Sequence, residues 1–281
     1  MLYVDDETSR LEGVILGIAD DIGEIRPNNP KIAEHIRNGT TPTQGSIIRE
    51  VEGFKQVLED NGVKVYRPEN IDGVLQVFTR DIGFVIDNRF VRARMQHQST
   101  ESEYKAITHL LKGYDILEPP EGVLIEGGDI VLAPGKVFVG IGKRTNQAGY
   151  EFIRDSFRNR SVYPMMPYVS DDPQKNVLHL DYVFQPVGEE HMLVYAEGFK
   201  RSPDHIFRHF KPIFLTLDEK YHLASNVLSL SPEKVVSAKG FTRVNDELRK
   251  IGLDVIELPY AEVAKFNGLF RCSTLPLYRK P

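Results

Sequence analysis

Residues 123–146 read VLIEGGDIVLAPGKVFVGIGKRTN, and this stretch decides how the rest of the chain is interpreted. Apolar runs at residues 123–125, 130–133 and 137–141 predict three strands, the last two joined by a turn. Two acids and two glycines, Glu126-Gly127-Gly128-Asp129, separate the first two runs. Glycine within a strand marks a bulge or a close approach of the backbone to a ligand, and a buried carboxylate needs a partner. We therefore predict that Glu126 points into a cavity and binds a cation there, rather than lying in a surface loop.

The same pattern recurs along the chain as a hairpin, then a helix, then a third strand. Apolar spacing predicts hairpins within residues 74–95, 177–196 and 226–238, helices at 46–61, 101–112, 146–159, 203–210 and 245–250, and further strands at 14–17, 63–66, 114–117, 213–215 and 254–258.

One polar residue occupies a similar place in each copy. Subtracting residue numbers gives spacings of 45, 53, 47 and 46 between successive members of the series Asp81, Glu126, His179, Asn226 and Cys272. A period of this size indicates a repeat, although any α/β chain shows strands at comparable intervals. Because each unit is too small to bury its own apolar face, five units closing in a ring would share one core. The sequence thus predicts one α/β domain over residues 1–281, with these residues at the ends of first strands and facing the ring axis.

Composition excludes several classes of protein. The 281 residues are 41% hydrophobic and carry a net charge of -5, so no basic surface points to nucleic acid. No run approaches the about 18 apolar residues that a membrane span requires. The single cysteine, Cys272, rules out an intramolecular disulfide, and the acidic N-terminus lacks a signal-peptide core, which together favour the cytoplasm. No histidine and cysteine set has zinc spacing, so we expect neither a metal nor another cofactor.

One cysteine, one histidine and several acids around a central channel suggest a particular chemistry. A thiolate is a nucleophile, and a histidine can protonate a leaving group and then deprotonate water. Buried acids favour a planar cation with many donors, and guanidinium fits that description best. We predict that Cys272 attacks a guanidinium carbon, that an amine leaves, and that water or a second amine resolves the covalent amidino-thioether.

Four motifs resemble those of the guanidino-group modifying enzymes. They are Phe78-Thr79-Arg80-Asp81, Glu126-Gly127-Gly128-Asp129, His179-Leu180-Asp181 and the near-C-terminal Cys272, in this order over residues 74–278. The superfamily contains arginine deiminases, amidinotransferases and dimethylarginine dimethylaminohydrolases. The resemblance implies a five-fold pseudosymmetric α/β propeller (pentein) of ββαβ units, which agrees with the five copies counted above.

The resemblance also implies roles for six residues of this chain. Cys272 resembles the nucleophile, His179 the general acid and base, and Glu126 the acid beside the histidine. The substrate-binding positions are, by the same resemblance, two acids that hold the guanidinium and one arginine that holds the substrate carboxylate: Asp81, Asp181 and Arg144.

Two departures keep the member of the superfamily open. Deiminases and amidinotransferases commonly have histidine before the nucleophile, where this chain has Arg271. Dimethylaminohydrolases usually have lysine where Asp181 stands. We expect a cofactor-free hydrolase of a small arginine-like substrate, with amidino transfer to an acceptor amine as the close alternative.

Other interpretations stay open from sequence alone. A non-catalytic ring of the same fold occurs in a ribosome anti-association factor, and fold does not fix function. A cysteine amidase is a weaker alternative, because it needs oxyanion donors rather than acids. Taken singly, Cys272 and His179 are commonly inert core residues, Asp81 could pair with a neighbouring arginine, and Arg144 could cap a helix. A homodimer is only the most frequent oligomeric state.

Overall fold

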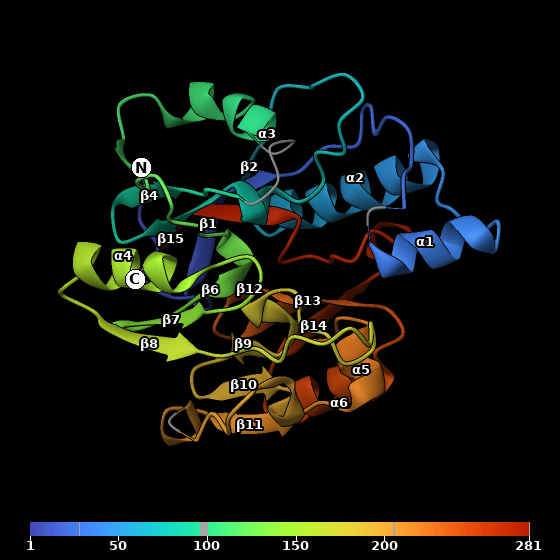
Figure 1. Ribbon diagram of the computed structural model, residues 1–281. Helices are drawn as coiled ribbons and strands as arrows, with labels where there is room; N and C mark the ends of the chain where they lie inside the picture. The colour runs from blue at the N-terminus through green and yellow to red at the C-terminus, as the bar shows by residue number, and fades with distance from the viewer. Residues whose placement is uncertain (28, 96–100, 205, 281) are drawn as a thin grey trace.

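The computed structural model describes residues 1–27, 29–95, 101–204 and 206–280. Strands in these residues form five three-stranded sheets, and Figure 1 shows the helices on the outside with the sheets between them. No helix of the described residues is long and apolar enough to cross a membrane.

Four of the sheets follow one after another along the chain and share one topology. The first two strands form an antiparallel hairpin, and the third lies parallel to the second. Their strands are β3 (Gly83–Ile86), β4 (Arg89–Arg92) and β5 (Asp115–Leu117); β6 (Ile130–Ala133), β7 (Lys136–Gly140) and β8 (Ser161–Met165); β9 (Phe184–Val187), β10 (His191–Val194) and β11 (Lys211–Phe214); β12 (Leu228–Ser231), β13 (Lys234–Ala238) and β14 (Asp254–Leu258).

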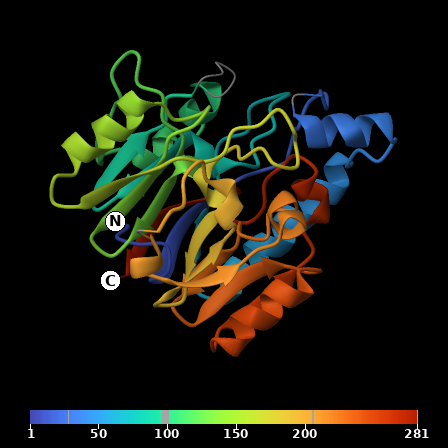
Figure 2. The ribbon, with the colours of Figure 1, turned by 60° about the horizontal axis from the view of Figure 1, so that its bottom comes forward.

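The fifth sheet joins the two ends of the chain. Strand β15 (Thr274–Lys280) pairs antiparallel with β1 (Arg10–Leu16), and β1 pairs parallel with β2 (Lys64–Tyr66). Figures 1 and 2 show the red β15 beside the blue β1, with both termini on the same side of the molecule. The C-terminal strand thus supplies the first hairpin partner that the N-terminal unit lacks, and it ties Cys272 to the start of the chain.

The helices follow local sequence signals. In α2 (Gln44–Asp60), Thr43 accepts the backbone N–H of Ser46 and forms a capping box with it, while Ile47, Val51 and Phe54 face the core. The others are α1 (Pro30–Arg37), α3 (Glu101–Lys105), α4 (Gln147–Ser156), α5 (Leu217–Tyr221), α6 (Thr242–Lys250) and α7 (Ala261–Ala264). The predicted helices at 46–61, 146–159 and 245–250 are therefore confirmed to within a few residues at their ends.

Three predicted elements are wrong in kind or length. The helix expected at 101–112 ends at Lys105, and a separate 3₁₀ turn covers Thr108–Leu111. The helix expected at 203–210 is only a 3₁₀ turn at Ile206–Arg208 among the described residues, and residue 205 lies outside them. The apolar run 123–125 is no strand, because Ile125 makes a single bridge to Arg94. An apolar run shows that a segment is buried without showing that its backbone has a strand partner.

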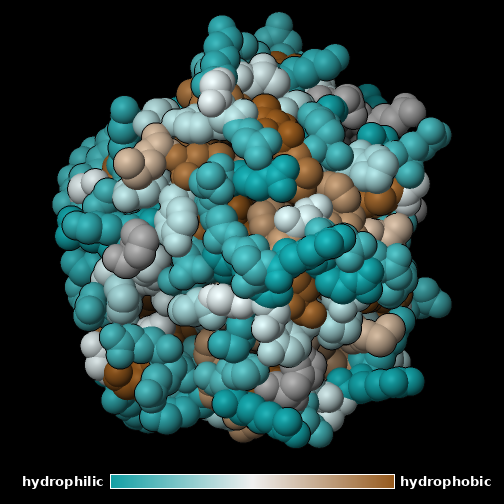
Figure 3. Space-filling model, turned by 90° about the vertical axis from the view of Figure 1, so that its left-hand side faces the viewer, coloured by the Kyte–Doolittle hydropathy of each residue, from teal (hydrophilic) through white to brown (hydrophobic). Residues whose placement is uncertain are grey.

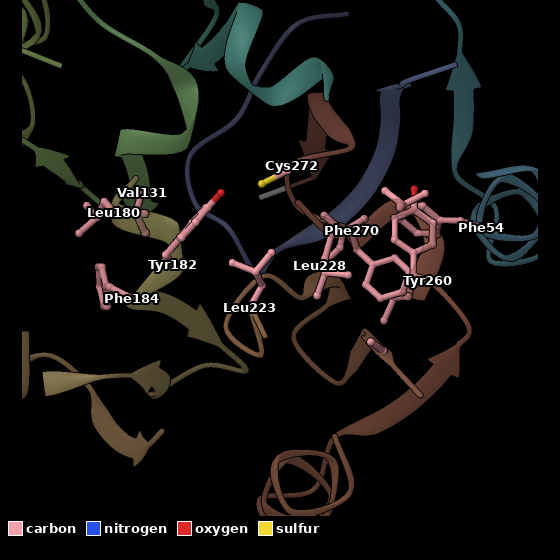
Figure 4. Packing of buried hydrophobic residues seen from close by; sticks show 14 of the residues in the cluster. Phe54, Val131, Leu180, Tyr182, Phe184, Leu223, Leu228, Tyr260, Phe270 and Cys272 are labelled. Atoms are coloured by element: carbon pink, nitrogen blue, oxygen red, sulfur yellow. The ribbon is translucent and has the colours of Figure 1, made fainter. Parts of the chain in front are cut away.

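Aromatic packing fixes the segment before β15. The ring of Phe270 lies 4.9 Å from that of Phe54 on α2 and 4.4 Å from that of Tyr260, measured between centroids. Figure 4 shows this group beside Cys272, with Tyr182 on the other side of the sulfur.

The face of the molecule in Figure 3 is mostly hydrophilic, with apolar residues in small areas between polar ones. The apolar side chains thus serve mainly to hold the interior, including the loop that carries Cys272.

Candidate active site

The polar residues of the repeat lie where the chain enters each hairpin, not at the end of a preceding strand. Asp81 lies in the 3₁₀ turn Thr79–Ile82 before β3, Glu126 precedes the turn Gly127–Asp129, and His179 precedes the turn Leu180–Tyr182. The 3₁₀ turn points the side chain away from the sheet that follows, so the turns of different units bring their side chains together. The predicted strand-end position was wrong, but the convergence it implied is confirmed by the contacts below.

The two glycines of the EGGD motif permit close packing between units. A Cβ on Gly127 would lie 2.1 Å from the carbonyl oxygen of Arg80, and a Cβ on Gly128 would lie 2.6 Å from the ring of His179. The expectation of a close approach is confirmed, but the neighbours are backbone and imidazole of adjacent units rather than a ligand. Only glycine fits at these two positions.

Replacing Gly128 with alanine should therefore displace the His179 ring and lower turnover by about 10²-fold, because catalytic groups tolerate little misplacement. The matched control is Gly53→Ala on α2, where a Cβ meets nothing within 4 Å. That control should stabilise the protein by about 0.5–1 kcal/mol and leave turnover unchanged. Steady-state kinetics and thermal unfolding of both variants check the prediction, which fails if Gly128→Ala keeps the rate of the control.

His179 lies in a carboxylate environment. Its Nε2 is 2.8 Å from Oε2 of Glu126, and its Nδ1 is 3.8 Å from Oδ1 of Asp81. Burial lowers the pKa of His179, but the charges of Asp81 and Asp129 and the bond with Glu126 raise it more, to about 10. The imidazole is therefore protonated at neutral pH and can donate a proton.

The thiol of Cys272 is buried beside amide and carboxylate groups. Its sulfur lies 3.1 Å from Nδ2 of Asn226 and 3.7 Å from Oδ2 of Asp181. Burial and the charges of Asp181 and Asp81 raise the pKa of the thiol well above its ordinary value. Arg271 lowers that pKa, as its place in the sequence suggests, but too little to reverse the rise. In the free protein the thiol is thus kept neutral.

Asn226 contacts Cys272 at both its backbone and its sulfur. Its Oδ1 accepts the backbone N–H of Cys272 at 3.0 Å and that of Leu269 at 3.2 Å. Its Nδ2 reaches both the sulfur and Oδ2 of Asp181, each at 3.1 Å. The sequence marked Asn226 only by its phase in the repeat, and that phase was the signal that could have identified it as a site residue.

Three buried carboxylate oxygens around the site have no hydrogen-bond partner among the described residues. One is Oδ2 of Asp129, and the others are Oδ1 of Asp81 and Oδ1 of Asp181, the two aspartates whose charges act on the thiol. Burial and the neighbouring acids Glu126 and Asp181 raise the pKa of Asp81 to about 6, although His179 lowers it. A buried carboxylate oxygen without a donor is costly, so this pair is suited to receive a cation.

Glu103 of α3 adds a further acid that the sequence did not suggest. Burial and the charge of Asp81 raise its pKa to about 8. Helical spacing gives no sign of this approach, because it depends on how α3 packs against the 3₁₀ turn of its own unit. With a pKa of about 8, Glu103 is mostly protonated at neutral pH and adds a neutral carboxyl group beside Asp81.

Arg271 lies fully buried behind the site and connects two acids. Its guanidinium donates to Oδ2 of Asp181 at 2.8 Å, to Oε1 of Glu7 at 2.9 Å and to the carbonyl of Ile130 at 2.6 Å. Burial alone would raise the pKa of Glu7, yet the charges of Arg271 and Arg80 bring it to about 2. Arg80, with its Nη2 3.9 Å from Glu7, thus faces this buried pair.

Arg144 turns toward the acids of the site. Its Nη1 lies 3.3 Å from both carboxylate oxygens of Glu126, and its side chain is 24% exposed. The structure therefore brings all six predicted site residues into one connected group, with Arg144 at the exposed end. Among the described residues, no group of three histidines, cysteines or acids has the geometry to hold a metal ion.

Comparison with known proteins agrees with this arrangement. Residues 26–279 match the family of eukaryotic N,N dimethylarginine dimethylhydrolases. The uncharacterized protein YkgA of Bacillus subtilis (strain 168) is 30% identical over 228 residues, which are 77% of this chain and 78% of YkgA. An arginine deiminase of Mycobacterium tuberculosis (strain H37Rv) is 28% identical over 247 residues, and the match spans only 60% of that longer protein.

Solved structures share the fold over nearly the whole chain. The N-terminal domain of ArgZ, a cyanobacterial arginine dihydrolase bound to its product, superposes with a TM-score of 0.84 at 20% identity, covering 95% of this chain and 97% of the other. SxtG, an amidinotransferase of Microseira wollei, gives 0.80 at 19% identity, covering 100% and 98%. With a family match over residues 26–279, the chain belongs to the N,N dimethylarginine dimethylhydrolase family of guanidino-group modifying enzymes.

Proposed function

We propose that the protein hydrolyses the guanidino group of a small arginine-like substrate through a covalent amidino intermediate on Cys272. The observation that carries this proposal is the pair of unpartnered oxygens on Asp81 and Asp181, whose charges both act on the thiol. A planar guanidinium between them would supply the missing donors and place its carbon near the sulfur. A neutral substrate could donate hydrogen bonds to these oxygens but would leave the buried negative charge without a compensating cation.

The reaction follows from the protonation states of the free site. Binding of the cation offsets the charges of Asp81 and Asp181, so the thiol can lose its proton to solvent and regains it when the product leaves. The thiolate attacks the guanidinium carbon and forms the C–S bond, and the imidazolium of His179 gives its proton to the departing amine as the C–N bond breaks. The neutral imidazole then takes a proton from water, whose oxygen attacks the amidino carbon. The C–S bond breaks, and a ureido product leaves with Cys272 regenerated.

The other site residues support these steps in the proposed mechanism. Glu126 accepts from Nε2 of His179 and orients the ring toward the leaving group. Arg144 keeps Glu126 ionised from the exposed side and is placed to meet a substrate carboxylate. No step needs a cofactor.

We also propose one catalytic domain over residues 1–281, built as a five-fold pseudosymmetric propeller. The shared sheet topology and the likeness to ArgZ and SxtG support this arrangement.

Amidino transfer to an acceptor amine is the second candidate function. It uses the same residues up to the covalent intermediate. The fold is shared with SxtG, an amidinotransferase, and is therefore compatible with transfer. A non-catalytic binding ring explains neither the buried thiol beside Asn226 nor the His179–Glu126 pair.

Product analysis separates these functions. The purified protein is incubated with arginine, dimethylarginine and related guanidino compounds, with and without glycine or ornithine, and small molecules are identified by mass spectrometry. We expect a ureido product whether or not an acceptor amine is present. A new guanidino compound that forms only when the acceptor amine is present would show amidino transfer instead of hydrolysis. If no compound gives a product, both the hydrolase and the transferase proposals are contradicted.

The ionisation of Cys272 should respond to cations. Burial and the two aspartates favour the neutral thiol in the free protein, so its thiolate should appear only at strongly alkaline pH. A bound guanidinium places positive charge beside the sulfur and should shift the thiolate titration to lower pH. The ultraviolet absorbance of the thiolate, followed with and without a non-hydrolysable guanidinium ligand, measures the shift. The absorbance of Cys272→Ala gives the contribution of all other groups and is subtracted. Equal thiolate titrations with and without ligand would contradict the mechanism.

A further inference from the structure

A small cavity outside the candidate active site is lined by two lysines. Its volume is about 50 Å³, and its lining includes Lys31 of α1, Lys220 of α5, Asn176, Tyr182 and Asn267. This space is large enough for a few water molecules or one compact ionic group. In the part of the chain that the structure describes, no acidic side chain lines it.

The two lysines are held in place by neutral acceptors. Lys220 is 2% exposed, and its ammonium donates to the backbone carbonyls of Asn176 at 2.5 Å and Gln174 at 2.9 Å. The ammonium of Lys31 donates to the carbonyl of Tyr221 and lies 4.7 Å from the centre of that ring. These contacts orient both groups without neutralising either charge.

Electrostatics at the cavity favours an added negative charge. Burial lowers the pKa of Lys220 to about 8, and the charge of Asp172 offsets only part of that effect. Burial and repulsion from Lys220 lower the pKa of Lys31 to about 8 as well. Each ammonium has three N–H donors, so donors remain beyond those given to the carbonyls. An anion between the lysines would relieve their repulsion and use these donors.

We propose that this cavity binds a small oxyanion of carboxylate size, held by the ammonium groups of Lys31 and Lys220. The cavity also adjoins the catalytic residues, because Tyr182 lines it and packs edge-on against the ring of His179, at 6.1 Å between centroids. The Tyr182 hydroxyl donates to the carbonyl of Asn267, another lining residue on the loop that leads to Cys272. The oxyanion would come either from solution or from the carboxylate of a substrate, and in the second case that carboxylate would meet the two lysines instead of Arg144.

Thermal unfolding of the whole protein at constant ionic strength tests the site, with sodium acetate and inorganic phosphate as probes. Saturating the site should raise the unfolding midpoint by about 3 °C, because the ligand binds only the folded state. The rise should be lost in Lys31→Met and in Lys220→Met. The matched control is Lys112→Met, which removes a charge from an exposed lysine outside the cavity.

Lys220→Met also removes donors from two carbonyls, so Lys31→Met decides the result if Lys220→Met fails to fold. No rise with either probe in the unaltered protein overturns the proposal, and so does a rise of equal size in Lys31→Met. A rise in the unaltered protein and Lys112→Met that is absent from Lys31→Met supports it.

The source of the oxyanion is resolved in the Cys272→Ala background, where no turnover occurs; this arm rests on the proposed function. L-arginine and agmatine, which lacks the carboxylate, are compared as ligands. A larger midpoint rise with arginine that disappears on adding Lys31→Met identifies the substrate carboxylate as the occupant. Equal rises with both, alongside a rise with free acetate or phosphate, identify an independent anion. Failure of both ligands to bind, with acetate still effective, would count against the proposed function and leave the anion site standing.

Discussion

Replacing Cys272 with alanine should lower product formation by at least about 10³-fold, because the proposed mechanism forms its covalent bond on this sulfur. Among the described residues Cys272 is the only cysteine, and its sulfur lies among Asn226, Asp181 and the cation site. Since the thiol is neutral in the free protein, removing it leaves no buried charge unpaired. The folded structure should therefore survive the change, and substrate should still bind.

Measured product formation and thermal unfolding of Cys272→Ala check this expectation together. Cys272→Ser is the matched variant, because serine keeps a small polar group beside Asn226 but is a far weaker nucleophile. Both variants should unfold near the temperature of the unaltered protein. Turnover of either within about tenfold of the unaltered rate would exclude nucleophilic catalysis by this residue.

Replacing Arg271 with methionine should lower the free energy of unfolding by about 3–5 kcal/mol, because it leaves two buried carboxylates without their cation. Arg271 is fully buried and connects Glu7 to Asp181. The change should also lower activity, since Asp181 loses the contact that orients it. Arg249→Met is the matched control: that arginine is 44% exposed and pairs with surface acids, so its loss should cost no more than about 1 kcal/mol.

Denaturant unfolding of the two arginine variants measures the difference. Equal losses would mean that the buried contacts of Arg271 contribute no more than a surface pair. Glu7→Gln distinguishes the contribution of Glu7 to stability from that of Asp181. It keeps the shape of Glu7 and removes its charge, while the Arg271–Asp181 contact remains.

Glu7 should also make the free energy of unfolding depend on pH in the acidic range. Its pKa falls from the ordinary 4.5 to about 2 in the folded protein. Because the folded pKa is the lower one, the contribution of Glu7 is fully present above pH 4.5 and is lost as the pH falls toward 2. Glu7→Gln should flatten the stability curve in this window, which unfolding measurements at several pH values detect.

The fold was largely predictable because its repeat is visible in the sequence. Apolar runs around residues 130–133 and 137–140 formed β6 and β7 as expected, and α2 formed where apolar spacing placed it. The misassigned run at 123–125 is mostly buried but pairs only through the single bridge of Ile125 to Arg94. Burial leaves a mark in sequence, whereas the pairing partner of a strand is decided by distant segments.

The site was predictable only where repeat phase carried information. Phase and resemblance identified Cys272, His179 and Glu126, and the structure brings them into one group. Glu7 and Glu103 lie outside the repeat phase. The approach of Glu7 to Arg271 depends on closure of the chain ends, and that of Glu103 to Asp81 depends on how α3 packs against the turn before β3. Arg271 was noted as a departure, but its orientation toward Glu7 and Asp181 could not be read from its position next to Cys272.

The central claim is a covalent amidino intermediate on Cys272, and intact-protein mass spectrometry after rapid acid quenching tests it most directly. Protein mixed with excess reactive guanidino substrate should show a mass increase equal to one amidino adduct, mapped by peptide analysis to Cys272 and absent from Cys272→Ala. Turnover that proceeds with no adduct at any quench time, or an adduct that maps to another residue, would contradict the account.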